Sequence, residues 1–231
     1  MTLTMDFFET LQEDHKMIVS FNVRSIRNKI LSIESDRNFQ KANVLVIVDT
    51  RYGENEVDQL SCFVQPPIVS SYQRVALGQI VYHKENVISQ AFKTIEIDGL
   101  QQASITFMKI RHFWKQNFTF RNIFLFFIYI VPNCPNTVYE KVMDFVEQHC
   151  DSSDDIVMGD FNRNPTEMSR SFKTSAKKLH LIQHIQVPTH IQKNILDHIW
   201  TNLDSNLIYA NTFSTLVRSD HQPIFLAVRS E

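Results

Sequence analysis

The stretch Asp155–Asn162, DIVMGDFN, decides how the rest of the chain is interpreted. Its apolar start predicts a buried β-strand over Asp155–Met158, and Gly159 lets the backbone turn where that strand ends. Asp160 and Asn162 therefore stand at a strand end, where sheet-based sites present polar side chains. Because an Asp-Phe-Asn turn alone is more often a capping turn than a site, the interpretation depends on what the other strand ends carry.

Short β-branched and apolar runs predict further buried strands. They cover Met17–Val23, Val44–Val48, Gln79–Tyr82, Ser104–Ile110, Ile123–Val131 and Ile224–Val228. Apolar residues at three- and four-residue spacing predict helices. These cover Ser25–Asp36, Thr137–Cys150 and, more weakly, Thr166–Leu179. Because strands and helices alternate only in part, we expect an α/β (α+β) layered sandwich with helices outside mixed sheets.

Length and composition indicate one folded domain. The 231 residues contain no internal repeat and no linker, so we expect a single domain over 1–231, with 1–16 as an N-terminal extension. A net charge of -2 means that any affinity for nucleic acid must come from a local patch, and the basic segment Arg163–Lys193 is a candidate as well as an ordinary solvated helix. The apolar run Ile123–Val131 is far shorter than the roughly 20 residues of a membrane span.

A buried acid is predicted near the C-terminus. Asp197 lies within the apolar segment ILDHIW, where an unpaired carboxylate would be costly to desolvate. The motif SDHQP, directly before the last predicted strand, offers Asp220 and His221 as partners. A His oriented by a buried Asp suits the binding of a phosphate oxygen beside a metal. A core pair of Asp197 and His221 with no catalytic task is an equally good interpretation at this point.

Two strands near the N-terminus also end in polar residues. Asn22 ends the first strand, where Asn is a poor strand former and indicates a turn or a ligand. Asp49 ends the second strand and, taken singly, would cap a turn. Together with Asp160 and Asp220, these residues supply the carboxylate and amide oxygens that Mg²⁺ prefers.

Rival chemistries lack their motifs. The four glycines are isolated, so no P-loop or dinucleotide fingerprint can be assembled. The chain has no G-x-S-x-G elbow, no H-E-x-x-H helix and no Cys nucleophile motif, and its three cysteines have no CxxC spacing. Phosphodiester hydrolysis is the simplest hypothesis for the polar strand ends.

The ordered series of motifs resembles the endonuclease/exonuclease/phosphatase superfamily, which includes exonuclease III, the apurinic endonucleases and deoxyribonuclease I. The motifs are FNVRS at 21–25, DTR at 49–51, Tyr129 with Pro132 and Asn133, GDFN at 159–162, PTH at 188–190, LDHI at 196–199 and SDH at 219–221. Within the superfamily the series is similar to the endonuclease domains of mobile elements, either LINE-type retrotransposons or Helitron-like transposons. Arg24 stands where repair enzymes usually carry Asp, which favours that branch.

The resemblance implies a four-layer, deoxyribonuclease I-like sandwich and a role for each motif residue. In it, Asp160, Asn162, His221, Asp197 and Tyr129 are catalytic; Asn22, Asp49 and Asp220 hold Mg²⁺, with Mn²⁺ as a substitute; and Thr189, Arg24 and Asn133 bind substrate. The implied activity is a magnesium-dependent endonuclease that nicks DNA for a mobile element. A fused or associated reverse transcriptase or helicase would be its partner, and the implied location is intracellular and nuclear, with no membrane.

Asp49 departs from the family pattern, which has Glu at this position. Asp is one methylene shorter, so its carboxylate falls roughly 1 to 1.5 Å short, and magnesium tolerates imperfect octahedral geometry poorly. Three hypotheses therefore stay open: an active DNA endonuclease, a phosphatase or phosphodiesterase of the same fold acting on inositol phosphates or lipids, and a DNA-binding module with weakened catalysis.

Overall fold

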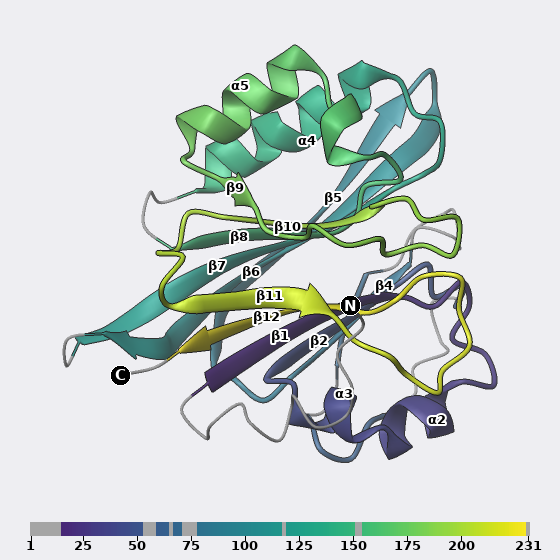
Figure 1. Ribbon diagram of the computed structural model, residues 1–231, viewed down its shortest axis with the longest axis vertical. Helices are drawn as coiled ribbons and strands as arrows, with labels where there is room; N and C mark the ends of the chain where they lie inside the picture. The colour runs from purple at the N-terminus through teal and green to yellow at the C-terminus, as the bar shows by residue number, and fades with distance from the viewer. Residues whose placement is uncertain are drawn as a thin grey trace.

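Two six-stranded sheets form the centre of the protein in the computed structural model, which describes residues 15–52, 59–64, 67–70, 78–116, 119–150 and 154–229 (Figure 1). The first sheet has the order β11-β12-β1-β2-β4-β3 and the second the order β5-β6-β7-β8-β10-β9. The strands of the first sheet are β1 (His15–Asn22), β2 (Val44–Val48), β3 (Ile68–Ser70), β4 (Gln79–His83), β11 (Ile208–Thr212) and β12 (Ile224–Arg229). Those of the second are β5 (Val87–Ile97), β6 (Leu100–Gln116), β7 (Thr119–Ile130), β8 (Asp155–Asp160), β9 (Ile182–Gln183) and β10 (Asp197–Thr201).

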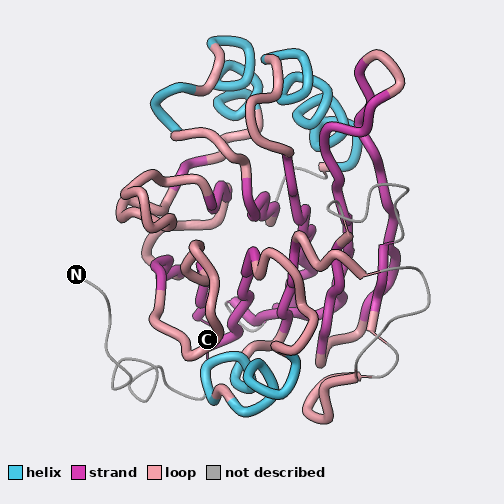
Figure 2. The backbone as a smooth tube through the Cα atoms, turned by 90° about the vertical axis from the view of Figure 1, so that its right-hand side faces the viewer, coloured by secondary structure: helices cyan, strands magenta, loops and turns pink. Residues whose placement is uncertain are grey.

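Both sheets are mixed and are covered by helices on their outer faces. β1 pairs in parallel with β2 and antiparallel with β12, while β7 pairs in parallel with β8, which pairs antiparallel with β10. Helices α2 (Ile30–Ser35) and α3 (Arg37–Lys41) pack on the first sheet, and α4 (Asn136–His149) and α5 (Arg170–Lys178) on the second (Figure 1). Figure 2 shows the same two helical layers on opposite sides of the pair of sheets. This confirms the expected four-layer sandwich.

Three apolar cores separate the four layers, and the strands alternate between them. On β1, Ile18 faces the core between the sheets, whereas Val19 faces the core beneath α2 and α3. On β8, Met158 faces the inter-sheet core and Val157 the core beneath α4 and α5. Because both faces of the central strands are buried, their sequences are continuously apolar rather than alternating. Full burial of each such side chain contributes about 1.5–3 kcal/mol.

The first predicted helix is shorter than expected. The pattern predicted a helix over Ser25–Asp36, but α2 begins only at Ile30. Arg24, Ser25 and Asn28 have positive φ angles, which a right-handed helix does not permit. A second short helix, α3, follows instead, and the side chain of Asp36 caps it by accepting a hydrogen bond from the backbone N–H of Asn38.

Two further expectations need correction. The predicted N-terminal extension ends earlier than residue 16, because His15 and Lys16 already pair with Arg229 and Val228 in the sheet; residues 1–14 lie outside the described part of the chain. Strands β3, β5, β9 and β11 were not predicted in their observed positions. β5 and β11 are largely half-exposed, so they lack the apolar run on which the prediction depends. Among the described helices, none is long and apolar enough to span a membrane.

The topology brings distant polar residues to one end of the sandwich. β1 ends at Asn22, β2 at Val48 and β8 at Asp160, so the residues after these strands gather at the same edge. β10 runs antiparallel to β8, so that its first residue, Asp197, pairs directly with Asp160. β12 runs antiparallel to β1, which puts the preceding SDH segment at this edge as well.

Candidate active site

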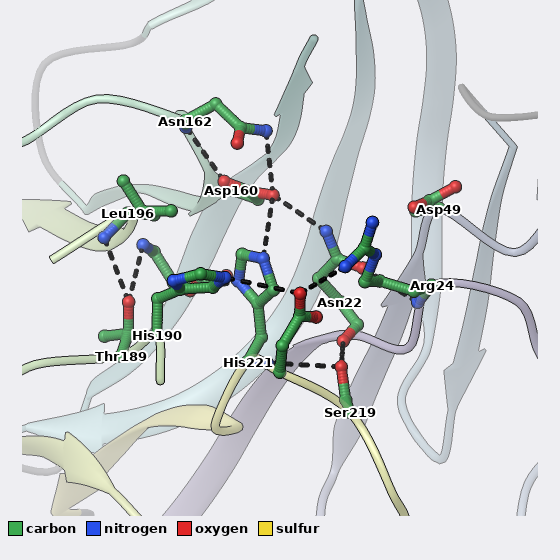
Figure 3. Close-up of polar contacts among 12 residues, drawn as sticks. Asn22, Arg24, Asp49, Asp160, Asn162, Thr189, His190, Leu196, Ser219 and His221 are labelled. Atoms are coloured by element: carbon green, nitrogen blue, oxygen red, sulfur yellow. Dashed lines mark hydrogen bonds and ion pairs between the residues drawn. The ribbon is translucent and has the colours of Figure 1, made fainter. Parts of the chain in front are cut away.

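Asp160 is the centre of a buried hydrogen-bond network (Figure 3). Its Oδ2 accepts hydrogen bonds from Asn22 Nδ2 at 2.8 Å and Asn162 Nδ2 at 3.0 Å, and its Oδ1 accepts one from the Asn162 backbone N–H at 2.8 Å. The side chain is fully buried. Burial, followed by the charge of Asp197, raises the pKa of Asp160 to about 7 despite these donors. The carboxyl group is therefore poised to exchange a proton near neutral pH.

Gly159 fixes the position of Asp160 against the neighbouring strand. Its φ is +138°, and a Cβ atom at this position would lie 2.0 Å from the backbone oxygen of Ile128 on β7. Only glycine permits both the backbone conformation and the approach of β7 to β8. The glycine in the GDFN motif is therefore needed for the register that sets Tyr129 opposite Asp160.

His221 is held between two buried acids. Its Nδ1 lies 2.8 Å from Asp197 Oδ2, and its Nε2 lies 3.9 Å from Asp160 Oδ2. Burial alone would lower the pKa of His221, but the charge and hydrogen bond of Asp197 outweigh it and raise the pKa to about 9. Nδ1–H donates to Asp197, and at neutral pH Nε2 carries the second proton. The imidazolium therefore presents a proton beside Asp160.

Thr189 orders the start of β10. Its hydroxyl oxygen accepts hydrogen bonds from the backbone N–H groups of Leu196 and Asp197, both at 3.0 Å (Figure 3). The side chain is fully buried. Its hydroxyl is thus used inside the protein to place the carboxylate that orients His221. The predicted contact between Thr189 and the DNA backbone stays a prediction.

Asp220 lies next to several basic side chains. Its Oδ2 forms an ion pair with Arg24 Nη1 and lies 3.3 Å from His190 Nε2. Burial would raise the pKa of Asp220, but the charges of His221 and Arg24 outweigh it, so that the pKa lies below its usual value. Ser219 Oγ donates to the backbone oxygen of Asn22 at 2.8 Å and thereby ties this segment to the end of β1.

Asp49 and Tyr129 complete the buried part of the site. Asp49 has a left-handed backbone, with φ of 50°, and its Oδ1 accepts a hydrogen bond from Arg51 Nε at 3.1 Å. Burial raises the pKa of Asp49, although Arg51 opposes the shift. Tyr129 packs in the inter-sheet core. Its pKa is raised by burial and then by the charges of Asp49 and Asp160, and Tyr129 pairs with Asp160 across β7 and β8.

The remaining predicted residues lie at the rim. Asn133 is exposed in the turn after β7, with a left-handed φ of 61°. The same turn region contacts the GDFN segment, because Asn162 Nδ2 donates to the backbone oxygen of Ile130. Arg24 is half-exposed and forms an ion pair with Asp220. The structure thus gathers Asn22, Arg24, Asp160, Asn162, Asp197, Asp220 and His221 by direct contacts.

Among the described residues, side chains at this site could hold a divalent metal ion. Two groups bring their ligand atoms within 4.8 Å of one another: Asp160 with Asp197 and His221, and His190 with Asp220 and His221. The Oδ1 atom of Asp220 is buried and has no hydrogen-bond partner among the described residues, so one carboxylate oxygen is left unsatisfied at the site. Carboxylates and the nearby Asn22 amide are the oxygen ligands that such a cation takes.

Three residues of the site had no role assigned from the sequence. His190 contacts Asp220 and its ring lies edge-on to His221, with ring centroids 4.9 Å apart. Arg51 pairs with Asp49, and Ser219 links the SDH segment to β1. Each stands within a motif that the sequence displays, PTH, DTR or SDH, so its place in the motif was the available signal.

The basic segment 163–193 does not form one surface at this site. Arg163 donates to Cys134 O and Asn136 Oδ1, and Lys178 pairs with Glu147 on α4. α5 lies in the outer layer beyond the second sheet (Figure 1). Of the two interpretations that the sequence left open, the helix portion of this segment therefore agrees with the ordinary solvated helix.

Comparison with known proteins identifies the fold. No family model and no curated protein sequence matches the chain. Among solved structures, the endonuclease domain of TRAS1, a telomere-specific non-LTR retrotransposon, has a TM-score of 0.65 at 16% identity and covers 93% of this chain and 98% of its own. The 3' phosphatase NExo from Neisseria, bound to product DNA hairpin, has a TM-score of 0.69 at 13% identity, covering 92% and 99%.

An apurinic (AP) endonuclease from Archaeoglobus fulgidus is also similar, with a TM-score of 0.62 at 16% identity, covering 94% of this chain and 100% of its own. The chain therefore has the fold of the endonuclease/exonuclease/phosphatase proteins, as the motifs suggested. A mobile-element endonuclease stands among the proteins that share this fold. At these identities the likeness is one of fold, and activity has to be argued from the site.

Proposed function

We propose that this protein is a metal-dependent phosphodiesterase that nicks DNA. The observation that carries the proposal is the buried arrangement of Asp160 and His221, whose Oδ2 and Nε2 atoms lie 3.9 Å apart. One is a carboxyl group with a pKa raised to about 7, and the other is an imidazole with a pKa raised to about 9. A proton acceptor and a proton donor thus stand side by side near neutral pH.

The reaction follows from these two groups. A water molecule attacks the phosphorus atom and transfers a proton to Asp160, while the bond between phosphorus and the leaving ester oxygen breaks and that oxygen takes up a proton from solvent water. His221 donates a hydrogen bond through Nε2 to a phosphoryl oxygen, where negative charge increases in the transition state. Asp197 keeps the imidazole in the required tautomer and orientation. Asn22 and Asn162 hold the Asp160 carboxylate in place.

Asp49, Asp220 and Asn22 are the residues that we propose to hold the cation, Mg²⁺ or Mn²⁺. When bound, such an ion neutralises phosphate charge as a Lewis acid. The unsatisfied Oδ1 atom of Asp220 supports this assignment. Arg24 and Asn133, at the exposed rim, are proposed to contact the substrate.

DNA is proposed as the substrate because the similar structures include the TRAS1 endonuclease and a 3' phosphatase bound to a DNA hairpin. The likeness to the TRAS1 endonuclease also supports a role in a mobile element, with a fused or associated reverse transcriptase or helicase as partner. Action on chromosomal DNA would require a nuclear location. The phosphodiesterase activity does not depend on the DNA substrate, the mobile-element role or the nuclear location.

The test is nicking of supercoiled plasmid in Mg²⁺. Wild type is expected to convert the plasmid to the open circle, and Asp160→Ala and His221→Ala to lose about a hundredfold or more in rate, as loss of a general base or acid does. Asp144→Ala is the matched control, since Asp144 is an exposed acid on the outer helix α4. Wild-type rates in both alanine variants would contradict the proposal.

A second candidate is a DNA-binding module with weakened catalysis. It is favoured by Asp49, which is shorter than the family's Glu and is already paired with Arg51. Asp49→Glu separates the two candidates, because a silent wild type with an active Asp49→Glu would identify a disabled nuclease. If none of these proteins nicks plasmid, phosphate release from inositol phosphates becomes the next assay.

A further inference from the structure

Two arginines form ion pairs with the two carboxylates that are proposed to hold the metal. Arg24 Nη1 forms an ion pair with Asp220 Oδ2, and Arg51 Nε lies 3.1 Å from Asp49 Oδ1. The arginine side chains are 54% and 49% exposed, whereas the carboxylates are 16% and 5% exposed. Each pair therefore consists of a solvent-facing guanidinium and a much less exposed carboxylate.

The backbone holds both arginines at the edge of the site. Arg24 has φ of 50° and Arg51 has φ of 53°, in the left-handed turns after β1 and β2. The backbone N–H of Ser25 donates to the backbone oxygen of Asp49 at 2.8 Å, which ties the two turns together. Left-handed conformations are unfavourable for residues other than glycine, and such strained residues cluster at active sites and ligand clamps.

Charge balance gives these arginines a task. A buried carboxylate needs a counter-charge, and a guanidinium supplies one before any metal arrives. A divalent cation that approaches the same carboxylate meets the repulsion of that guanidinium. A phosphodiester offers the guanidinium an alternative, since its two oxygens match the planar N–H fork as a carboxylate does.

We propose that Arg24 and Arg51 are resident counter-ions that weaken the binding of a divalent cation to Asp220 and Asp49, and that a substrate phosphodiester strengthens it by drawing the guanidiniums away. The proposal rests on the proposed function and adds the regulation of its metal site. Binding free energies are linked, so the cation strengthens phosphodiester binding by the same factor. The complete metal site then forms on the substrate.

The experiment measures Mn²⁺ affinity by electron paramagnetic resonance of the free ion, for wild type, Arg24→Gln, Arg51→Gln and the double variant. Each single variant is expected to bind Mn²⁺ about fivefold more tightly, the factor that corresponds to one exposed ion pair. The matched control is Arg121→Gln, because Arg121 pairs with buried Asp154 at the opposite end of β7. Its Mn²⁺ affinity is expected to equal that of wild type.

A second titration adds dimethyl phosphate as a minimal phosphodiester. It is expected to tighten Mn²⁺ binding to wild type and to leave the double variant unchanged. Equal or weaker Mn²⁺ binding in Arg24→Gln and Arg51→Gln, or equal tightening in Arg121→Gln, would overturn the inference while plasmid nicking by wild type still upheld the proposed function. Failure of every variant to bind Mn²⁺ would overturn the inference and the metal dependence together.

Discussion

At the scale of single residues, the site is defined by raised pKa values in two adjacent groups, Asp160 and His221. Asp160 and Asp197 are both buried next to His221, and the charges of both acids raise the pKa of the histidine. The negative charge of Asp197 raises the pKa of His221 and, after burial, contributes to raising the pKa of Asp160. One buried acid thus makes its neighbouring acid a better proton acceptor and keeps its neighbouring histidine charged.

These shifts predict a bell-shaped pH dependence of nicking. The reaction needs Asp160 deprotonated, so kcat/KM is expected to rise as the pH increases through about 7. It also needs His221 protonated, so kcat/KM is expected to fall as the pH increases through about 9. Asp197→Asn removes a charge that contributes to both shifts, so the pH at which kcat/KM falls is expected to decrease toward neutral pH. A rate that keeps rising above pH 10 would rule out a protonated His221.

At the scale of elements, the site depends on how closely β7 and β8 approach each other. The strands are parallel, and Gly159 lies where a side chain would collide with the Ile128 carbonyl. Phe161, two residues further on, stacks on His198 with ring centroids 4.7 Å apart and closes the outer core. The turn that carries Asp160 and Asn162 is therefore fixed from both sides.

Gly159→Ala is expected to lower the free energy of unfolding by about 3 kcal/mol or more, since the conformation alone costs of order 1–3 kcal/mol and the collision adds to it. Gly99→Ala is the matched control. Gly99 also has a positive φ, of +74°, but a Cβ atom there would have no neighbour within 4 Å. It should cost only about 1–2 kcal/mol. Urea denaturation followed by circular dichroism measures both, and equal losses would argue against a close strand contact.

At the same scale, the sequence predicts some strands and site residues and misses others. Strands buried on both faces, such as β2 and β8, were predictable because their sequences are apolar without interruption. β5 was not, since its exposed face removes that signal. The polar residues at strand ends were predictable from motifs and from the cost of burying Asp197. The partners Arg51 and His190 were not, because their contacts depend on left-handed turns and on a loop between distant strands.

At the scale of the whole molecule, the two sheets share one apolar core. Val46 and Val81 of the first sheet belong to the same cluster as Leu125 and Met158 of the second. A core shared in this way favours one cooperative folding unit, as expected for a single domain. Unfolding of both sheets in one cooperative step stays a prediction, and denaturation tests it.

The two tryptophans report on different layers. Trp114 lies in the core between the sheets, and Trp200 in the core beneath α4 and α5. In Trp200→Phe and Trp114→Phe, the remaining tryptophan fluorescence is expected to give the same urea midpoint as circular dichroism measured on the same variant. If the urea midpoint reported by Trp114 fluorescence were lower than the circular dichroism midpoint, the core between the sheets would open before the strands and helices unfold.

The position of β12 has a consequence for the chain as it is made. β12 lies between β11 and β1 and directly follows His221, so the first and last described strands are neighbours. A ribosome-bound chain that has emerged only as far as β10 contains Asn22, Asp160 and Asp197 but not His221. A nascent chain therefore cannot form the contact between His221 and Asp197 until the segment before β12 has emerged and β12 can insert between β11 and β1.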